Sequence, residues 1–432
     1  MLRNVLGTLQ KRGYSRILTP GGQVFPTQKN PENALKRFIV DKIRVSGPIT
    51  VAEYMKLSVG SSSVGYYGGF GTQKPVFGEK GDFITSPELT QLFGEMIGVW
   101  LYYELANTGH RGQWQLVECG PGTGQLMLDV VTSLNKFNEK DVSIHLVETS
   151  DALINEQEKL LCVDNSTTIY DDKPYVKKNK TKQGYPIFWY KNVDDIPENF
   201  TVFIANEFLD ALPIHQFKKN ENGAWNEIYV SIDENNDLCF MNSKGENLHS
   251  RGLISEEVRA QASKTNHEIS PDSGTFINQI VERIVHNGGF GLIIDYGHDG
   301  DRENFSLRAY KKHDQVHPLS DPGNIDITAD VDFKYLKDLV SDRAITFGPI
   351  MQREFLAQLG IGVRLRRLLQ MCDNRTKQEH LIKSYNFLMQ EMGEKFKVLS
   401  VFPKTLESIL EKRGTPEGFS STRPDSKKDE KQ

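Results

Sequence analysis

The sequence has few cysteines, no excess of basic residues and no long apolar run. Its 4 cysteines are scattered and form no Cys-x-x-Cys pair, which argues against a disulfide framework and favours a reducing compartment. Lys and Arg total 52 against 57 Asp and Glu, so no basic field exists to favour a nucleic-acid partner. No stretch approaches about 18 uninterrupted apolar residues, and no membrane span is therefore expected.

Both ends of the chain have a biased composition. No acidic residue precedes Glu32, and the basic residues of this segment include Arg3, Lys11, Arg12 and Arg16. A basic, acid-free N-terminus is typical of a mitochondrial transit peptide, with a disordered basic arm as the alternative. Residues 1–31 are therefore predicted to be a mitochondrial targeting segment and linker. Residues 414–432 are rich in Pro, Ser, Lys and Asp, which predicts a disordered tail.

A chain of 432 residues suits one large domain with insertions or two smaller domains. Residues 32–112 are predicted to be helical, with a Gly-rich loop at 58–81. From 113 to 402 strands and helices alternate, with an insertion at about 217–275 that begins with a β-hairpin. Strands are predicted at 114–118, 142–148, 186–190, 202–206 and 291–295. The alternation indicates a Rossmann-like α/β fold whose parallel sheet is covered on both faces.

The sharpest signal is a glycine-rich loop after the first predicted strand. That strand ends at Glu118, and Gly120, Gly122 and Gly124 follow at alternate positions. Glycines make a tight turn without Cβ clashes and let the backbone approach a bound nucleoside. The next strand ends at Glu148, where a carboxylate is placed to accept hydrogen bonds from ribose hydroxyls. These five residues are the predicted centre of a cofactor site.

A dinucleotide site is the first alternative for this loop. Its fingerprint, G-x-G-x-x-G/A, needs a small third residue that lets helix and strand touch, whereas Gln125 occupies that position here. The alternating glycines instead fit a loop that faces the methionine and ribose of S-adenosylmethionine. A turn without a ligand is the second alternative. Strand, loop, helix and Glu148 together favour a methyltransferase that binds S-adenosylmethionine.

A second group of polar residues follows the buried strand at 202–206. Asn206 ends this strand, and Glu207 and Asp210 come directly after it. Ligands of open parallel sheets bind beyond the carboxyl ends of the strands, so Asn206 is predicted to contact the cofactor. If a helix follows, Glu207 and Asp210 share one of its faces. The alternative is that the two acids only stabilise a helix N-terminus.

A metal site is not predicted. Acidic and imidazole side chains gather in one region, at Asp326, Asp330, Asp332, His313 and His317. Their spacings match no standard metal site, and solvated loop residues are the simpler interpretation.

Segments spread along the chain resemble the MidA-like mitochondrial protein-arginine methyltransferases, the assembly-factor methyltransferases of respiratory complex I. The matching segments are GPITVAEYM (47–55), YY (66–67), GDFITSPE (81–88), ECGPGTG (118–124), ANEFLDALPIHQF (205–217), DYG (295–297), DPGNIDITA (321–329) and MGEKFKVL (392–399). They occur in order and cover nearly all of the chain from 36 to 401. The family loop often has arginine where Thr123 stands here, and Cys119 replaces a residue that is commonly small or apolar.

The resemblance implies a seven-strand class I methyltransferase sheet with an N-terminal helical extension and an insertion. It also implies a mitochondrial matrix enzyme that uses S-adenosylmethionine to dimethylate arginine symmetrically on a core subunit of complex I. Asp82, in the matching segment 81–88, is expected to help order a loop over the cofactor.

The chemistry of arginine suggests which residues act. Its guanidinium is always charged and is a poor nucleophile, and a carboxylate can bind two of its nitrogens at once. Glu207 is the first choice for this role and Asp210 the second. Two alternatives remain, namely a methyltransferase of small molecules and a noncatalytic assembly chaperone with the same fold.

Overall fold

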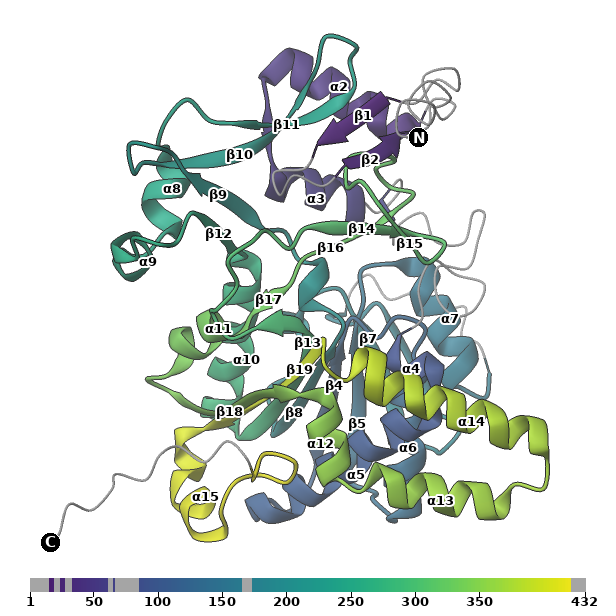
Figure 1. Cartoon of the computed structure of the whole chain (residues 1–432). Helices are drawn as coiled ribbons and strands as arrows, with labels where there is room; N and C mark the ends of the chain where they lie inside the picture. The colour runs from purple at the N-terminus through teal and green to yellow at the C-terminus, as the bar shows by residue number, and fades with distance from the viewer. Residues whose placement is uncertain are drawn as a thin grey trace, which may run out of the picture. The chain divides into compact units, whose positions relative to one another are not determined.

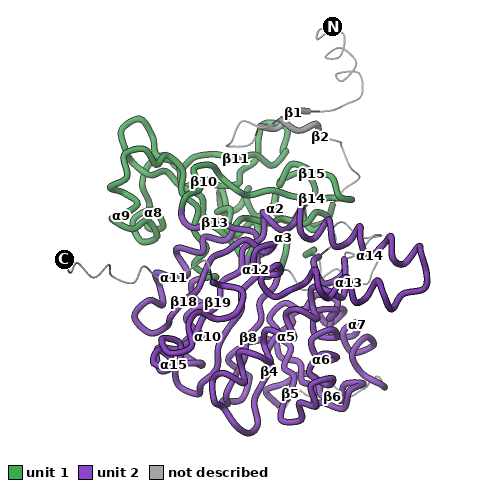
Figure 2. The backbone as a smooth tube through the Cα atoms, turned by 60° about the horizontal axis from the view of Figure 1, so that its bottom comes forward, with its two compact units in different colours: residues 1–83, 210–273, 301–330 green, residues 84–209, 274–300, 331–432 purple. Residues whose placement is uncertain are grey.

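The computed structural model describes residues 33–60, 65–66, 85–164 and 173–420, together with the backbone of β1 (Ser15–Leu18) and β2 (Val24–Thr27). The chain forms two compact units (Figure 2). Unit 1 comprises residues 1–83, 210–273 and 301–330, and unit 2 comprises residues 84–209, 274–300 and 331–432. These units differ from the predicted boundaries, because the helices after residue 84 belong with the sheet and 301–330 joins the insertion.

Unit 2 is built on a nine-stranded sheet with the order β18-β19-β13-β8-β4-β5-β7-β6, in which β17 also pairs with β13 (Figure 1). The strands are β4 (Trp114–Cys119), β5 (Val142–Val147), β6 (Lys177–Lys180), β7 (Pro186–Tyr190), β8 (Thr201–Asn206), β13 (Gly289–His298), β17 (Val331–Asp332), β18 (Ala344–Met351) and β19 (Phe396–Pro403). The α/β class with a large central sheet is confirmed. The count of seven differs, because β6 folds back antiparallel on β7 and the short β17 adds to β13.

Helices cover both faces of this sheet. The helices of unit 2 are α4 (Ser86–Leu89), α5 (Gln91–Thr108), α6 (Gln125–Lys136), α7 (Asp151–Leu161), most of α10 (Pro271–Asn287), α11 (Phe333–Val340), α12 (Gln352–Gln358), α13 (Ile361–Met371), α14 (Arg375–Phe387) and α15 (Glu407–Arg413). The core on one face joins α5 and α6 to Leu116 and Val202. Phe203, the next residue of β8, points the opposite way, where Ile280 of α10 packs over Gly291.

The strands form where continuous apolar runs permit burial on both faces. Every residue of β4 and β8 is buried, as expected for central parallel strands. The helical region predicted at 32–112 is interrupted between α4 and α5, because Thr90 is extended (φ −164°, ψ 137°) and caps α5 with its side chain. Gly94 and Gly98 let α5 approach α6 closely, since a Cβ at Gly94 would lie 2.5 Å from the Cβ of Asp129.

The predicted C-terminal tail begins later than expected. Residues 414–420 are packed, and Phe419 is fully buried with its ring against those of Trp100 and Phe355. The indole Nε1 of Trp100 also donates to the carbonyl of Glu417 at 2.8 Å. The polar composition of 414–432 concealed this, because one aromatic side chain is enough to anchor a short segment. Residues 421–432 lie outside the described part of the chain.

Besides the antiparallel pair β1 and β2, unit 1 contains two further sheets. A five-stranded sheet has the order β11-β10-β9-β12 with β3 paired to β10, and a three-stranded sheet has the order β15-β14-β16. The strands are β3 (Ile49–Thr50), β9 (His215–Lys219), β10 (Trp225–Ile232), β11 (Leu238–Asn242), β12 (Asn266–Ile269), β14 (Arg308–Lys311), β15 (Asp314–Val316) and β16 (Asp326–Thr328). The helices are α2 (Ala34–Ser46), α3 (Val51–Gly60), α8 (Leu248–Leu253) and α9 (Glu256–Ala260). The hairpin predicted in the insertion is present as β10 and β11.

A capping interaction starts α3 as the sequence predicts, because the Thr50 hydroxyl accepts the N–H of Glu53 at 3.0 Å. Across the described residues, no helix is both long and apolar enough to span a membrane.

Candidate active site

Four neighbouring strands of the central sheet run parallel, and three of them (β8, β4 and β5) end level with one another while β13 continues to His298. Their order is β13, β8, β4 and β5. Cys119 at the end of β4 pairs with Val147 of β5 and with Ala205 of β8, and Asn206 pairs with Ile294 of β13. From β4 the chain proceeds to β5 on one side and later returns to β8 on the other. This is a topological switch point, where open parallel sheets bind their ligands.

Most of the predicted site residues follow these strand ends. The glycine loop follows β4, Glu148 follows β5 and Glu207 follows β8, all within unit 2. The Gly120 N–H donates to the Val147 carbonyl at 3.1 Å, which fixes the start of the loop against β5. Gly120, Glu148 and Glu207 therefore occupy one edge of the sheet.

The loop conformation requires glycine. Gly120, Gly122 and Gly124 have φ values of 68°, 53° and 88°, in the left-handed region that residues with a Cβ rarely adopt. Gly120 is also packed tightly, because a Cβ there would lie 2.6 Å from the ring of Phe208 in the loop after β8. The two loops thus touch at the sheet edge.

Glu148 is buried and held in place by its neighbours. Its carboxylate accepts the N–H of Ser150 at 2.8 Å and the side-chain amide of Gln157 at 3.2 Å. The same amide of Gln157 donates to the Gly122 carbonyl at 2.8 Å, while its oxygen accepts from the indole of Trp189. Gln157 therefore ties the glycine loop to the carboxylate. Sequence reasoning missed it, since no local pattern marks this position on α7.

Two buried acceptors in the site have no hydrogen-bond partner among the described residues. They are Oε2 of Glu118 and Oδ1 of Asn206. Burial raises the pKa of Glu118 to about 8 and that of Glu148 to about 7. An unsatisfied buried acceptor is costly and calls for a donor. S-adenosylmethionine offers such donors in its ammonium group, its ribose hydroxyls and its adenine amino group, so these residues fit that cofactor.

Glu207 has an unusual backbone. Its φ is 52°, and its side-chain Oε1 accepts the N–H of Ser86 at 2.9 Å and the amide of Asn206 at 3.3 Å. The helix considered after Asn206 is absent, because only a short 3-10 turn (Leu209–Ala211) follows. The argument that Glu207 and Asp210 share a helix face is therefore wrong. A non-glycine residue held in the left-handed region is strained, and such strain gathers at functional sites.

Asp295 holds the loop that carries Glu207. It is fully buried within β13, one residue beyond the partner of Asn206, and its Oδ2 accepts the N–H groups of Phe208 and Leu209 at 3.1 and 2.8 Å. Its Oδ1 accepts the N–H of Tyr296 at 2.9 Å. The position of Asp295 at a strand end was visible in the sequence, but its partners were not.

Asp210 lies in unit 1 and is nearly fully buried. Burial raises its pKa to about 6, with Arg308 lowering it and Asp330 raising it. Arg308 in turn forms an ion pair with Asp330. The structure therefore places Asp210 in a charged network of unit 1, whereas the other described site residues belong to unit 2. Asp82 lies outside the described residues.

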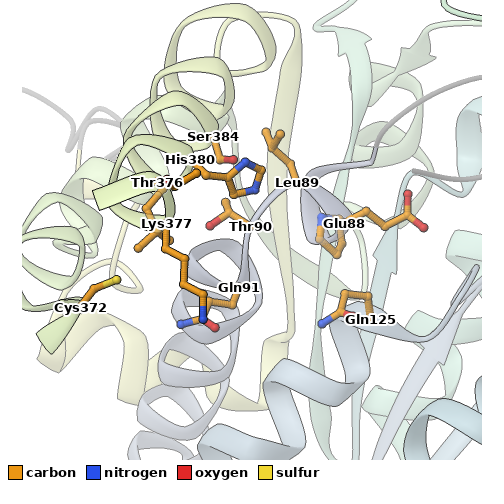
Figure 3. Close-up of a pocket in the computed structure, with 12 residues that line it drawn as sticks. Glu88, Leu89, Thr90, Gln91, Gln125, Cys372, Thr376, Lys377, His380 and Ser384 are labelled. Atoms are coloured by element: carbon orange, nitrogen blue, oxygen red, sulfur yellow. The ribbon is translucent and has the colours of Figure 1, made fainter. Parts of the chain in front are cut away.

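A pocket with a mixed polar and apolar lining adjoins the glycine loop within unit 2. Its volume is about 680 Å³, and Figure 3 shows side chains from α4, α5 and α14 pointing into it. Glu88 lines the pocket and accepts a hydrogen bond from the hydroxyl of Thr123 at 3.2 Å. Thr123 is the residue that stands in place of the arginine expected from the family resemblance. Gln125, the first residue of α6, also lines the pocket. Lys377 and His380 of α14 give its other wall basic character.

Comparisons with known proteins agree with this geometry. The sequence profile of a family described as putative S-adenosyl-L-methionine-dependent methyltransferases matches residues 96–350. A crystal structure from Burkholderia thailandensis, of a protein described as a "likely methyl transferase" bound to S-adenosyl-homocysteine, superposes with a TM-score of 0.72 at 23% identity. It covers 91% of this chain and 96% of its own, and it shows that the fold is shared.

Curated relatives cover nearly the whole chain. A Caenorhabditis elegans protein named protein arginine methyltransferase NDUFAF7 homolog, mitochondrial, is 61% identical over 97% of this chain and 97% of its own length. The human protein arginine methyltransferase NDUFAF7, mitochondrial, is 36% identical over 87% of this chain and 85% of its own. The chain therefore belongs to the NDUFAF7 family of mitochondrial protein arginine methyltransferases, which are S-adenosyl-L-methionine-dependent enzymes.

Proposed function

We propose that this methyltransferase forms symmetric dimethylarginine on a core subunit of respiratory complex I and so supports assembly of the complex. The observation that carries the proposal is the carboxylate of Glu207, held beside the glycine loop on a strained backbone. The curated relatives of this protein are named protein arginine methyltransferases. A carboxylate is the side chain suited to bind a guanidinium through two hydrogen bonds.

The cofactor-binding residues of the proposal are Glu118, Glu148, Asn206 and the three glycines of the loop, with Asp82 expected to help. S-adenosylmethionine supplies an electrophilic methyl group on its sulfonium sulfur. Glu148 would accept hydrogen bonds from the ribose hydroxyls. This role is supported by Ser150 and Gln157, which orient its two oxygens. Glu118 and Asn206 offer the buried acceptors that lack partners within the described residues.

Glu207 would act on the methyl acceptor. The Ser86 N–H fixes its Oε1, so the carboxylate is oriented before substrate arrives. A carboxylate that binds two guanidinium nitrogens draws positive charge toward them and leaves the third nitrogen richer in electrons. Holding that nitrogen in line with the methyl group supplies most of the acceleration in such a displacement. Asp210, the second predicted residue, is proposed to contribute less, because Arg308 already compensates its charge.

Cofactor affinity should depend on pH through Glu148. Burial raises its pKa to about 7, so its carboxyl is protonated below pH 7 and ionised above it. Only the ionised form accepts hydrogen bonds from both ribose hydroxyls. The dissociation constant for S-adenosylmethionine should therefore be about tenfold higher at pH 6 than at pH 8.

This prediction is tested by measuring the dissociation constant for S-adenosylmethionine by calorimetric titration between pH 6 and pH 8. Glu148→Gln should abolish the part of the pH dependence that belongs to this carboxylate, while any part due to Glu118 would persist. Equal affinity of the parent protein at pH 6 and pH 8 would contradict the assignment.

The proposed activity is tested by incubating the purified protein with methyl-labelled S-adenosylmethionine and isolated core subunits of complex I. Label should appear on one subunit as symmetric dimethylarginine. Asymmetric dimethylarginine would refute the symmetric product. Label on small molecules alone would support a metabolite methyltransferase, and the absence of any transfer would support an assembly chaperone.

The relatives are named mitochondrial proteins, and we propose the matrix as the compartment. The acid-free basic N-terminus supports this, since such segments direct import. In isolated mitochondria the protein should resist external protease after rupture of the outer membrane, whereas degradation at that stage would exclude the matrix.

A further inference from the structure

We propose that unit 1 binds one zinc ion through His215, Glu227 and His249. The three residues come from β9, β10 and α8, and all belong to unit 1. Nδ1 of His215 lies 2.6 Å from Oε1 of Glu227, and Nδ1 of His249 lies 2.9 Å from Oε2. The three potential ligand atoms lie within 4.8 Å of one another. The site is separate from the methyl-transfer chemistry proposed above.

The charge of Glu227 is the first argument for a cation. Its side chain is fully buried, and among the described residues no lysine or arginine forms an ion pair with it. Its polar partners include the two imidazoles and the side-chain amide of Asn247. Buried carboxylates are normally paired with a cation or bound to a metal. A divalent ion held by the carboxylate and both imidazoles would neutralise this charge.

The donor set indicates which ion. Two imidazole nitrogens and one carboxylate oxygen match zinc sites in which a fourth position stays open to water. His249 is half exposed, with 48% of its side chain accessible, so solvent can reach that position. Tetrahedral zinc holds its ligand atoms about 3.3 Å apart. Oε1 of Glu227 lies 2.6 Å from Nδ1 of His215 and 3.2 Å from Nδ1 of His249. Zinc bound to all three atoms would therefore need outward shifts of roughly 0.7 Å at most, with each imidazole proton carried on Nε2.

The surroundings of the three ligands orient them. The side-chain amide of Asn247 donates to Oε2 of Glu227 at 2.5 Å and to the hydroxyl of Tyr229 at 2.9 Å. The oxygen of the same side chain accepts the N–H of Ser250 at 2.8 Å and so caps α8. One residue therefore fixes both the carboxylate and the helix that presents His249. Such outer contacts are typical of built metal sites.

The consequence would be a crosslink within the insertion. His215 and Glu227 are 12 residues apart, and Glu227 and His249 are 22 apart, so a metal would join three elements that share no short motif. Binding to the folded form alone stabilises it by mass action. Zinc should therefore raise the thermal stability of the whole chain.

The experiment uses the full chain without a histidine tag, stripped with a chelator and dialysed. Zinc titration against a chromophoric chelator and elemental analysis should give one ion per chain. His249→Ala, an exposed position that should not disturb folding, should weaken binding roughly a hundredfold or more. The matched control is His286→Ala, an exposed histidine on α10, which should bind zinc like the parent.

Cobalt provides a readout that is independent of activity. The parent loaded with Co²⁺ should show the intense visible absorption of a tetrahedral site, and His249→Ala should not. The proposal is overturned if the parent binds no more zinc than His249→Ala, or if its cobalt spectrum is that of the hydrated ion. Either outcome would mean that the three residues form only a hydrogen-bonded network, and neither would affect the proposed methyl transfer.

Discussion

Glu207→Gln should reduce methyl transfer to arginine on the order of a hundredfold or more while leaving S-adenosylmethionine binding intact. Glutamine keeps the size of the side chain, and its amide oxygen can still accept the N–H of Ser86 that Glu207 accepts at 2.9 Å. The loop should therefore keep its conformation. What is lost is the negative charge, which no neutral group can supply to a bound guanidinium.

Single-turnover transfer at saturating cofactor measures this effect, because a modest binding defect is then masked. The matched control is Glu282→Gln, an exposed acid on α10 that should react at the parental rate. A role limited to the N-terminus of α4, where Glu207 accepts the N–H of Ser86, would instead predict a stability loss of about 0.3–1 kcal/mol and near-normal turnover. A Glu207→Gln enzyme that methylates at the parental rate would show that this carboxylate does not bind substrate.

Gly122→Val should abolish measurable S-adenosylmethionine binding while the protein stays folded. Gly122 has φ 53°, a conformation that costs a residue with a Cβ about 1–2 kcal/mol and suits a β-branched side chain least. The substitution should also displace the Gly122 carbonyl, which accepts the amide of Gln157 at 2.8 Å. Because the same amide reaches Glu148, the carboxylate that we propose binds the ribose would lose its support as well.

Calorimetry with S-adenosylmethionine tests this expectation, and circular dichroism confirms that the variant is folded. Gly109→Val is the matched control. Gly109 ends α5 with φ 76°, and a Cβ there would meet no atom within 4 Å. It should lose similar stability through backbone strain but bind the cofactor normally. Undiminished binding by folded Gly122→Val would refute the assignment of the loop.

The sequence alone was sufficient for the strand, glycine loop and helix that begin the cofactor site. The strand and the loop could both be predicted because each depends on residues that are adjacent in the sequence. An apolar run such as β4 is stable only when both faces are buried. Contacts within one residue make a left-handed φ costly for any residue with a Cβ, so Gly120, Gly122 and Gly124 indicate the turn directly. The placement of Glu148 and Glu207 at one edge followed from the parallel alternation.

Other features were decided only by the tertiary structure. Glu207 was assigned to a possible helix, but Asp295, 87 and 86 residues from Phe208 and Leu209, captures their N–H groups and turns the backbone another way. Gln157 reaches Gly122 across 35 residues. Within one segment of unit 1, the packing of β9, β10 and α8 brings His215, Glu227 and His249 together. Side-chain periodicity reports which face of an element is buried, whereas these contacts depend on which elements pack against one another and in what register.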